Sequence, residues 1–232
     1  ELVKIPTGNS NAHVDWLARE VPRGATVAVD GQVLGLAAAQ TLKQGLAAAG
    51  VLLRTDIDLL GEIWPDRPAL PAMPVYAHAA PHAATPRAAK LAQVRQAIAA
   101  RGATHHFIST VDDVAWLTNL RGSDVSYNPV FLAHLLLDMT GATLFVGEGK
   151  VDAALRAQLA ADGVQLAPYA EAGAALAALA EGATLLVDPR RVTLGFRERV
   201  RCAVVEAINP STLLKSRKSA EEADFVREAM AE

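Results

Sequence analysis

The chain has 232 residues with a formal net charge of −3; 51% of the residues are hydrophobic and 20% are charged. These values are typical of a folded protein with a sizeable core, and they disfavour a disordered chain or a general nucleic-acid binder, which needs clustered positive charge. Cys202 is the only cysteine, which excludes an internal disulfide and favours a reducing compartment such as the cytoplasm. No apolar run approaches the roughly 20 residues that cross a membrane.

The amino-terminal part predicts strands that alternate with helices. Strands are expected over 2–6, 24–30 and around 51–53, with an amphipathic helix over 11–20 and another helix between the last two strands. Residues 64–86 then hold six of the chain's 12 prolines. Proline fixes φ and lacks a backbone donor, so this stretch is predicted to be an extended linker and neither a helix nor a central strand.

The following part predicts a longer series of elements. In chain order we expect a helix over 86–102, a strand over 104–109, a helix that begins at Thr110, and a hairpin of 131–139 and 143–146 around Thr140-Gly141. A helix over 151–162 closed by Gly163, a strand over 164–168, a helix over 171–180 and a strand over 182–188 follow. The last elements are another helix, a strand around 203–205 and a helix over 215–232. Thr110 and Asp113 have the spacing of a capping box, and Lys218 and Glu222 are spaced to support the last helix.

The chain contains an internal repeat. Gly24-Ala-Thr-Val-Ala-Val-Asp30 recurs as Gly182-Ala-Thr-Leu-Leu-Val-Asp188, and the order of strands and helices around both copies is the same. Strands alternating with helices predict an α/β layered fold, and the matching order predicts two similar units. The first unit lacks the longer first half of the second, so it is expected to be a partial copy.

The stretch 111–137 is not explained by packing. It contains one Trp, one Arg, two Asn and three Asp, then a Tyr-Asn-Pro break, and it passes directly into an apolar strand-like segment. It resembles the middle domain of aminopeptidase P, the Xaa-Pro aminopeptidases, where a helix of the form D-x-x-A-W-L-x-N is followed by R-G-x-D and Y-N-P-V. The matching residues are Asp113, Ala115, Trp116, Leu117, Asn119, Arg121, Gly122, Asp124, Tyr127, Asn128, Pro129 and Val130. Asp113 is one place closer to Ala115 than that form has it, whereas Asp112 fits the spacing.

The resemblance extends over essentially the whole chain. It implies that 1–70 is the partial first creatinase-like domain, that 71–210 is the complete second domain, and that 211–232 is a junction helix leading to a catalytic domain. Lys218 and Glu222 fit the K-x-x-x-E pattern of that junction. The implied fold is α/β of the creatinase/prolidase amino-terminal-domain type, a mixed sheet with flanking helices.

The resemblance also implies an activity for the full-length protein. In this family of metallopeptidases a third, pita-bread domain binds two divalent metals, usually manganese, and removes the first residue from peptides with proline second. A metal-activated hydroxide makes such an amide hydrolysable at neutral pH. No residue here matches the family's two Asp, one His and two Glu ligands, which are expected beyond Glu232. We therefore expect no catalytic residue, metal ligand or bound cofactor in this segment, and no activity of the segment alone.

The expected role is to shape access to the active site and to carry subunit contacts. The implied partners are the protein's own catalytic domain, a second copy in a homodimer, and a peptide substrate at the domain interface, in the cytoplasm, with no nucleic acid and no membrane. The alternative is a binding module of a catalytically inactive superfamily member. A third possibility is a free-standing domain that binds a small molecule. The residues after Glu232 would separate the first two, because an enzyme needs the metal ligands there.

Residues that could form a metal site within the chain have simpler structural roles. His105 and His106 are adjacent on a predicted strand, so their side chains point to opposite faces and cannot chelate one ion. Asp112 and Asp113 lie in the first turn of a predicted helix, where negative charge complements the helix dipole.

The candidate site residues are Trp116, Arg121, Asp124, Tyr127 and Asn128. In a structural role, Arg121 would pair with Asp124, Asn128 would satisfy backbone groups before Pro129, and Trp116 would pack the helix against the sheet. In a functional role, the loop would lie at the mouth of the catalytic pocket and contact the substrate or a neighbouring domain. Our hypothesis is that Arg121 is a domain-docking or substrate-side cation.

Overall fold

The computed structural model describes residues 2–4 and 11–231. The chain forms two compact units, one made of Glu1–Pro68 with Thr193–Glu198 and the other of Ala69–Val192 with Arg199–Glu232. The boundaries 1–70, 71–210 and 211–232, and the interpretation of the first unit as a partial copy, stay predictions. Among the described residues, no helix has both the length and the apolar character needed to cross a membrane.

The first unit contains a two-stranded parallel sheet with helices. Its elements are α1 (Ala12–Glu20), β1 (Thr26–Ala28), α2 (Leu36–Ala49), β2 (Leu52–Arg54) and α3 (Leu59–Ile63), and residues Thr193–Glu198, most of them in α8 (Leu194–Arg199), join them. A small core of Val14, Leu42, Leu46 and Val51 holds α1 and α2 to the sheet. Of the strand predicted over 2–6, residues 2–4 are not a strand and Ile5 and Pro6 lie outside the described residues.

The second unit is built on a six-stranded mixed sheet. Its order is β10-β9-β4-β6-β7-β8, in which β4 and β6 and also β6 and β7 are antiparallel and the other neighbours are parallel. The strands are β4 (His105–Ile108), β6 (Ala133–Asp138), β7 (Ala142–Val146), β8 (Val164–Pro168), β9 (Thr184–Val187) and β10 (Ala203–Glu206). Antiparallel β6 and β7 are the predicted hairpin, and parallel β9 and β10 match parallel β1 and β2 in the order that the repeat predicts. The predicted α/β mixed-sheet fold is confirmed.

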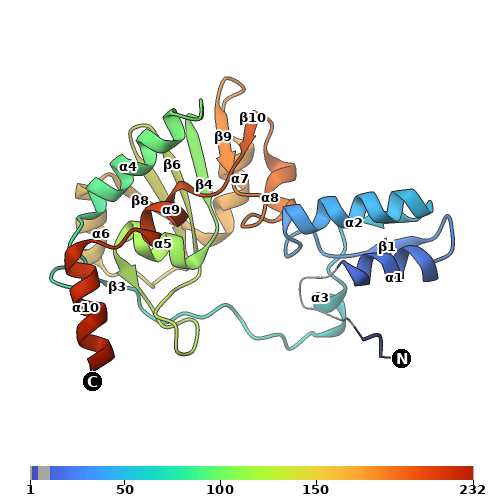
Figure 1. Ribbon diagram of the computed structural model, residues 1–232, viewed down its shortest axis with the longest axis horizontal. Helices are drawn as coiled ribbons and strands as arrows, with labels where there is room; N and C mark the ends of the chain where they lie inside the picture. Colours follow the sequence, from blue (N-terminus) through green and yellow to red (C-terminus); the bar gives the residue numbers. More distant parts are fainter. Residues whose placement is uncertain (1, 5–10, 232) are drawn as a thin grey trace. The chain divides into compact units, whose positions relative to one another are not determined.

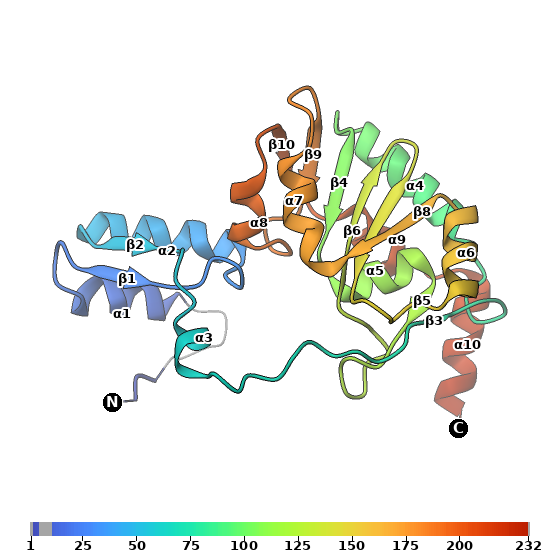
Figure 2. The same cartoon turned by 180° about the vertical axis from the view of Figure 1, so that it is seen from behind.

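Helices cover both faces of this sheet. α4 (Arg87–Ala99), α5 (Val111–Thr118) and α9 (Pro210–Ser216) lie on one face, and α6 (Ala153–Ala161) and α7 (Ala172–Ala177) on the other (Figures 1 and 2). Leu91, Val94 and Ile98 of α4 are fully buried because they recur at helical spacing on its sheet-facing side. α6 lies within the predicted range 151–162; the Asp152 side chain accepts from the Leu155 amide at its start, and the predicted Gly163 follows its end at φ 74°.

The linker contains neither a helix nor a central strand, as predicted, and its β3 (Tyr76–Ala77) pairs antiparallel with β5 (Leu120–Arg121) in a sheet of two strands. Two local predictions differ from the structure. The helix predicted over 171–180 is shorter: a 3-10 turn over Tyr169–Glu171 leads into α7, which ends at Ala177. Thr110 does not cap α5 with its side chain, because its hydroxyl donates to the Asp113 carboxylate at 2.8 Å instead.

The carboxyl-terminal segment is two helices and not one. α9 ends at Ser216 and α10 (Ala220–Ala231) begins after a break over 217–219. A reciprocal capping box starts α10: the Ser219 amide donates to Glu222 Oε2 at 3.0 Å, and the Glu222 amide donates to the Ser219 hydroxyl at 3.2 Å. Lys218 precedes this helix and donates to the Lys215 carbonyl, so the predicted support of one helix by Lys218 and Glu222 is wrong.

Candidate functional site

A pocket of about 360 Å³ lies in the second unit beside the 111–137 stretch. Its walls come from the linker, α5, β5 and the loop after it, and from α9, α10 and the break between these two helices. Three of the five predicted site residues line it, namely Trp116, Arg121 and Asn128. The resemblance therefore pointed to residues that the fold brings together around one concave surface.

Arg121 is held on β5 by backbone carbonyls. Its Nη1 donates to the carbonyls of Ala115 at 3.0 Å and Leu120 at 2.9 Å. No carboxylate of the described residues lies within ion-pair distance of its guanidinium, so the Arg121–Asp124 pair considered from the sequence is wrong. Burial lowers the pKa of Arg121 from its ordinary value, because a desolvated charge is less stable.

Asp124 is a structural residue. Its side chain is 0% exposed and forms an ion pair with Lys150, whose side chain is 1% exposed. The same carboxylate accepts from the Leu132 amide at 2.7 Å, and Lys150 Nζ also donates to the Pro71 carbonyl at 3.3 Å. The pair thus ties the loop after β5 to β6 and to the linker. Asp124 does not line the pocket, so its side chain cannot contact a ligand there.

Tyr127 lies at the tip of the loop after β5 and does not line the pocket. The Asn128 amide donates to the Val125 carbonyl at 3.2 Å, and Tyr127 within this turn is fully exposed at φ 61°. Asn128 lines the pocket, and its main-chain carbonyl accepts from the Val130 amide at 2.7 Å. Its side chain makes no hydrogen bond within the part of the chain that the structure describes, so the alternative in which Asn128 satisfies backbone groups before Pro129 is wrong.

Gly122 lets the loop approach the segment that precedes β6 closely. A Cβ at this position would lie 2.7 Å from Phe131 Cβ and 3.3 Å from the Val130 carbonyl oxygen. Real side chains do not come so close, so the glycine of the R-G-x-D pattern is explained by this contact.

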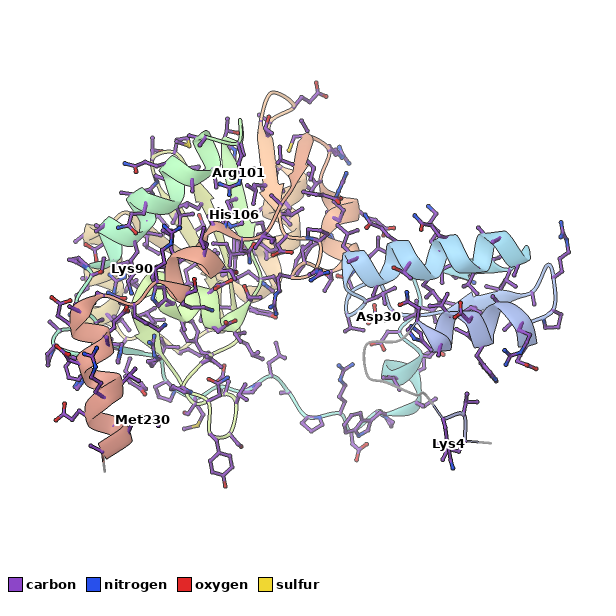
Figure 3. All side chains as sticks on the ribbon, in the orientation of Figure 1. Lys4, Asp30, Lys90, Arg101, His106 and Met230 are labelled. Atoms are coloured by element: carbon purple, nitrogen blue, oxygen red, sulfur yellow. The ribbon has the colours of Figure 1, made fainter. Side chains whose placement is uncertain are left out.

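Trp116 rests on a lysine that the sequence analysis missed. Lys90 of α4 is 3% exposed, and its Nζ lies 4.3 Å from the centroid of the half-buried Trp116 ring. Lys90 also donates to the Trp116 carbonyl at 3.1 Å and to Asn119 Oδ1 at 2.7 Å, and Asn119 ends α5 with φ 51° (Figure 3 labels Lys90). Burial lowers the pKa of Lys90 to about 8. The sequence signal that could have indicated its burial is helical spacing, because Lys90 lies four residues before Val94 and eight before Ile98 on the buried face of α4.

Asp112 and Asp113 connect α5 to α9. Lys215 pairs with both carboxylates, and Asp113, which is buried, also accepts from Asn209 Nδ2 at 3.2 Å. Burial raises the pKa of the Asp113 carboxyl, but hydrogen bonds from Lys215, Thr110 and Asn209 together hold it below its ordinary value. The aspartates act by tertiary contacts and not only by favouring the helix dipole.

The residues present do not fit a metal centre. Across residues 2–4 and 11–231, no group of three or more His, Cys, Asp or Glu side chains is placed to hold a metal ion. His105 is partly exposed on β4 while His106 is fully buried, as the alternation of a strand requires.

Comparison with known proteins identifies the family. The family model described as Creatinase/Prolidase N-terminal domain matches residues 66–222. This chain belongs to the creatinase/prolidase N-terminal domain family. The family membership and the fold predicted from the 111–137 stretch are confirmed.

Relatives of this creatinase/prolidase N-terminal domain protein are peptidases by name. A probable Xaa-Pro aminopeptidase P of Metarhizium acridum is 38% identical over 158 residues, which are 67% of this chain and 26% of the relative. Aminopeptidase P2 of Arabidopsis thaliana is 34% identical over 196 residues, which are 83% of this chain and 27% of the relative. The chain thus spans about a quarter of the length of the curated relatives it matches.

A solved structure has the same fold. The X-prolyl aminopeptidase of Caenorhabditis elegans, described as a cytosolic enzyme with a di-nuclear active site, matches with a TM-score of 0.88 and 25% identity. The match covers 98% of this chain and 38% of the other.

Proposed function

We propose that this chain is the non-catalytic portion of an Xaa-Pro aminopeptidase, a metallopeptidase that releases the first residue from peptides with proline second. The observation that carries the proposal is the match over 98% of this chain to an X-prolyl aminopeptidase of which it spans 38%. The names of the curated relatives point to the same activity. In this role the second unit shapes access to the active site, and the pocket beside Trp116 and Arg121 faces the peptide or the catalytic domain.

The metal centre of the proposed enzyme belongs to another part of the longer protein. The C. elegans relative is described as having a di-nuclear active site, and the described residues of this chain do not provide a matching donor set. Two divalent ions, manganese in our proposal, would supply the activated hydroxide there. The cytosolic description of that relative supports a cytoplasmic location, and the homodimer is proposed from the resemblance alone.

A comparison of two proteins tests this function. We expect manganese-dependent hydrolysis of an Xaa-Pro peptide by a version extended at the carboxyl end, and no hydrolysis by the 232-residue chain under the same conditions. Hydrolysis by the short chain would contradict the proposed division of labour. An extended protein that folds, lacks the metal ligands and hydrolyses nothing would favour the binding module of an inactive superfamily member.

Arg121 is the residue of this segment that we expect to matter most for the reaction. In the extended protein, Arg121→Ala should lower kcat/KM for an Xaa-Pro peptide by about tenfold to a hundredfold, since a hydrogen bond to a charged group contributes about 1.5–3 kcal/mol. The matched control is Arg101→Ala, because Arg101 also donates to a backbone carbonyl but lies outside the pocket. Unchanged hydrolysis together with an unchanged dimer dissociation constant would refute this role.

A further inference from the structure

The pocket beside Arg121 has an excess of positive charge. Three cations line it, Arg121, Lys215 and Lys218, against two acids, Asp112 and Glu222. Both acids already have donors, because Asp112 pairs with Lys215 and Glu222 Oε2 accepts from the Ser219 amide. Neither Arg121 nor Lys218 pairs with a carboxylate among the described residues, and Arg121 uses only its Nη1, for two backbone carbonyls. Its Nε and Nη2, the edge that matches a carboxylate, make no hydrogen bond to any described residue.

Neighbouring groups respond to this charge. Burial lowers the pKa of Lys90 to about 8, and although Glu222 opposes the shift, Arg121 and Lys218 add to it. Burial also lowers the pKa of His78, with further contributions from Arg121, His82 and Lys90. Arg121 and Lys218 therefore act on Lys90, which lies against the Trp116 ring, although burial is the main cause of the shift.

Most of the remaining lining residues are apolar, with His82 and Asn128 as the polar exceptions. Trp116 of α5, Val130 of the loop and Phe225 and Val226 of α10 line the pocket together with the charged groups. Its volume of about 360 Å³ is in the range of small-ligand sites, which are roughly 300–1,000 Å³. Apolar walls with one uncompensated guanidinium suit an anion that carries an apolar body, and they suit inorganic phosphate poorly.

We infer that this pocket binds the carboxyl-terminal end of a short peptide, with Arg121 as the main partner of the carboxylate and Lys218 as the second cation. The inference rests on the proposed function, because short peptides are the substrates that would bring a free carboxylate near the site. Lys218 contributes less than Arg121, since its ammonium lacks the two-donor edge of a guanidinium and its Nζ already donates to the Lys215 carbonyl. Trp116 and Phe225 contact the apolar side chains of the peptide.

Calorimetric titration of the 232-residue chain tests the inference without any hydrolysis. The probes are N-acetyl-prolyl-leucine, its carboxyl-terminal amide, and N-acetyl-prolyl-glutamyl amide, whose only carboxylate is on a side chain. We expect the free acid to bind and both amides to bind about tenfold or more weakly, the loss that a charge-assisted contact implies. Arg121→Gln should weaken binding of the acid by about tenfold or more, Lys218→Gln by less, and Arg101→Gln, outside the pocket, not at all.

The same titrations can overturn the inference. Equal affinity for the acid and its amide, no binding of the acid at millimolar concentration, or unchanged affinity of Arg121→Gln would each do so. Tighter binding of the glutamyl peptide would show that the pocket receives a protein side chain instead of a peptide terminus. Because Arg121 also donates to two backbone carbonyls, thermal unfolding measures whether each variant is folded. If Arg121→Gln does not fold, the affinities of Arg121→Lys, which keeps the charge, and of Lys218→Gln are used in its place. If the chain binds the acid but the extended protein hydrolyses no peptide, the proposed peptidase function is wrong and the proposed binding in the pocket stands.

Discussion

Asp124→Asn is expected to lower the free energy of unfolding by about 3–5 kcal/mol, the usual loss when one partner of a buried ion pair is removed. The side chains of Asp124 and Lys150 are 0% and 1% exposed, so the variant leaves the Lys150 ammonium buried without its counter-charge. It also weakens the acceptor of the Leu132 amide, which anchors the start of β6. Urea denaturation followed by circular dichroism measures the loss.

Two further variants test whether the loss of stability comes from the burial of the ion pair or from the loss of any ion pair. Asp224→Asn removes one partner of the exposed Arg227–Asp224 pair and should change the free energy of unfolding by less than about 1 kcal/mol. Combining Asp124→Leu with Lys150→Met replaces both charges and should recover most of the loss, since apolar residues of similar volume can replace a buried pair. A loss below about 1 kcal/mol for Asp124→Asn would show that the loop is not held by this pair.

Acidification from pH 6.5 to 4 is expected to remove several kcal/mol of stability through two buried histidines. His106 is fully buried and His134 is 6% exposed, and burial lowers the pKa of each to about 4 from 6.5 in the unfolded chain. A histidine whose pKa is lowered by folding stabilises the protein fully above pH 6.5, and this contribution is lost as the pH falls through about 4. Each unit of pKa shift corresponds to about 1.4 kcal/mol, so each histidine contributes roughly 3 kcal/mol.

Urea unfolding at a series of pH values between 7 and 4 measures this slope. His106→Leu removes one titrating group, so we expect the slope of stability against pH to fall, whatever the change in stability at pH 7. His134 and His78, whose pKa values burial also lowers, keep the remaining slope. His13→Leu is the matched control, because His13 is exposed on α1 of the first unit. The lowered pKa values of Asp113 and Asp138 add losses only below about pH 4, outside this window. A slope that His106→Leu leaves unchanged would contradict the assignment.

Most of the fold was predictable because its signals are local. The β6–β7 hairpin, the start and end of α6 and the repeated strand-helix-strand order depend on turn residues and periodicity within about ten residues. The break between α9 and α10 was missed although its signal is also local, since Ser219 and Glu222 form the capping box that was sought at Thr110 instead.

The candidate site was predictable only in part because its contacts are long-range. The resemblance identified the residues of the loop, and Trp116, Arg121 and Asn128 do share a pocket. Sequence proximity suggested that Arg121 would pair with Asp124, whereas the actual partner of Asp124 is Lys150, 26 residues away. Lys90 was hidden for the same reason, because only the packing of α4 against α5 places its ammonium over the Trp116 ring. Tertiary packing decides which charged residues distant in sequence come into contact, and the periodicity of the sequence does not predict this.

Tyr127 combines a left-handed backbone conformation with a fully exposed ring. An L-residue at φ 61° costs roughly 1–2 kcal/mol relative to right-handed backbone, and glycine adopts this conformation freely. The fully exposed phenol ring gives back no packing energy within the described residues. Tyr127→Gly therefore removes the ring and relaxes the backbone without a loss of packing. Any binding that this variant loses depends on contact between the ring and a surface outside this chain.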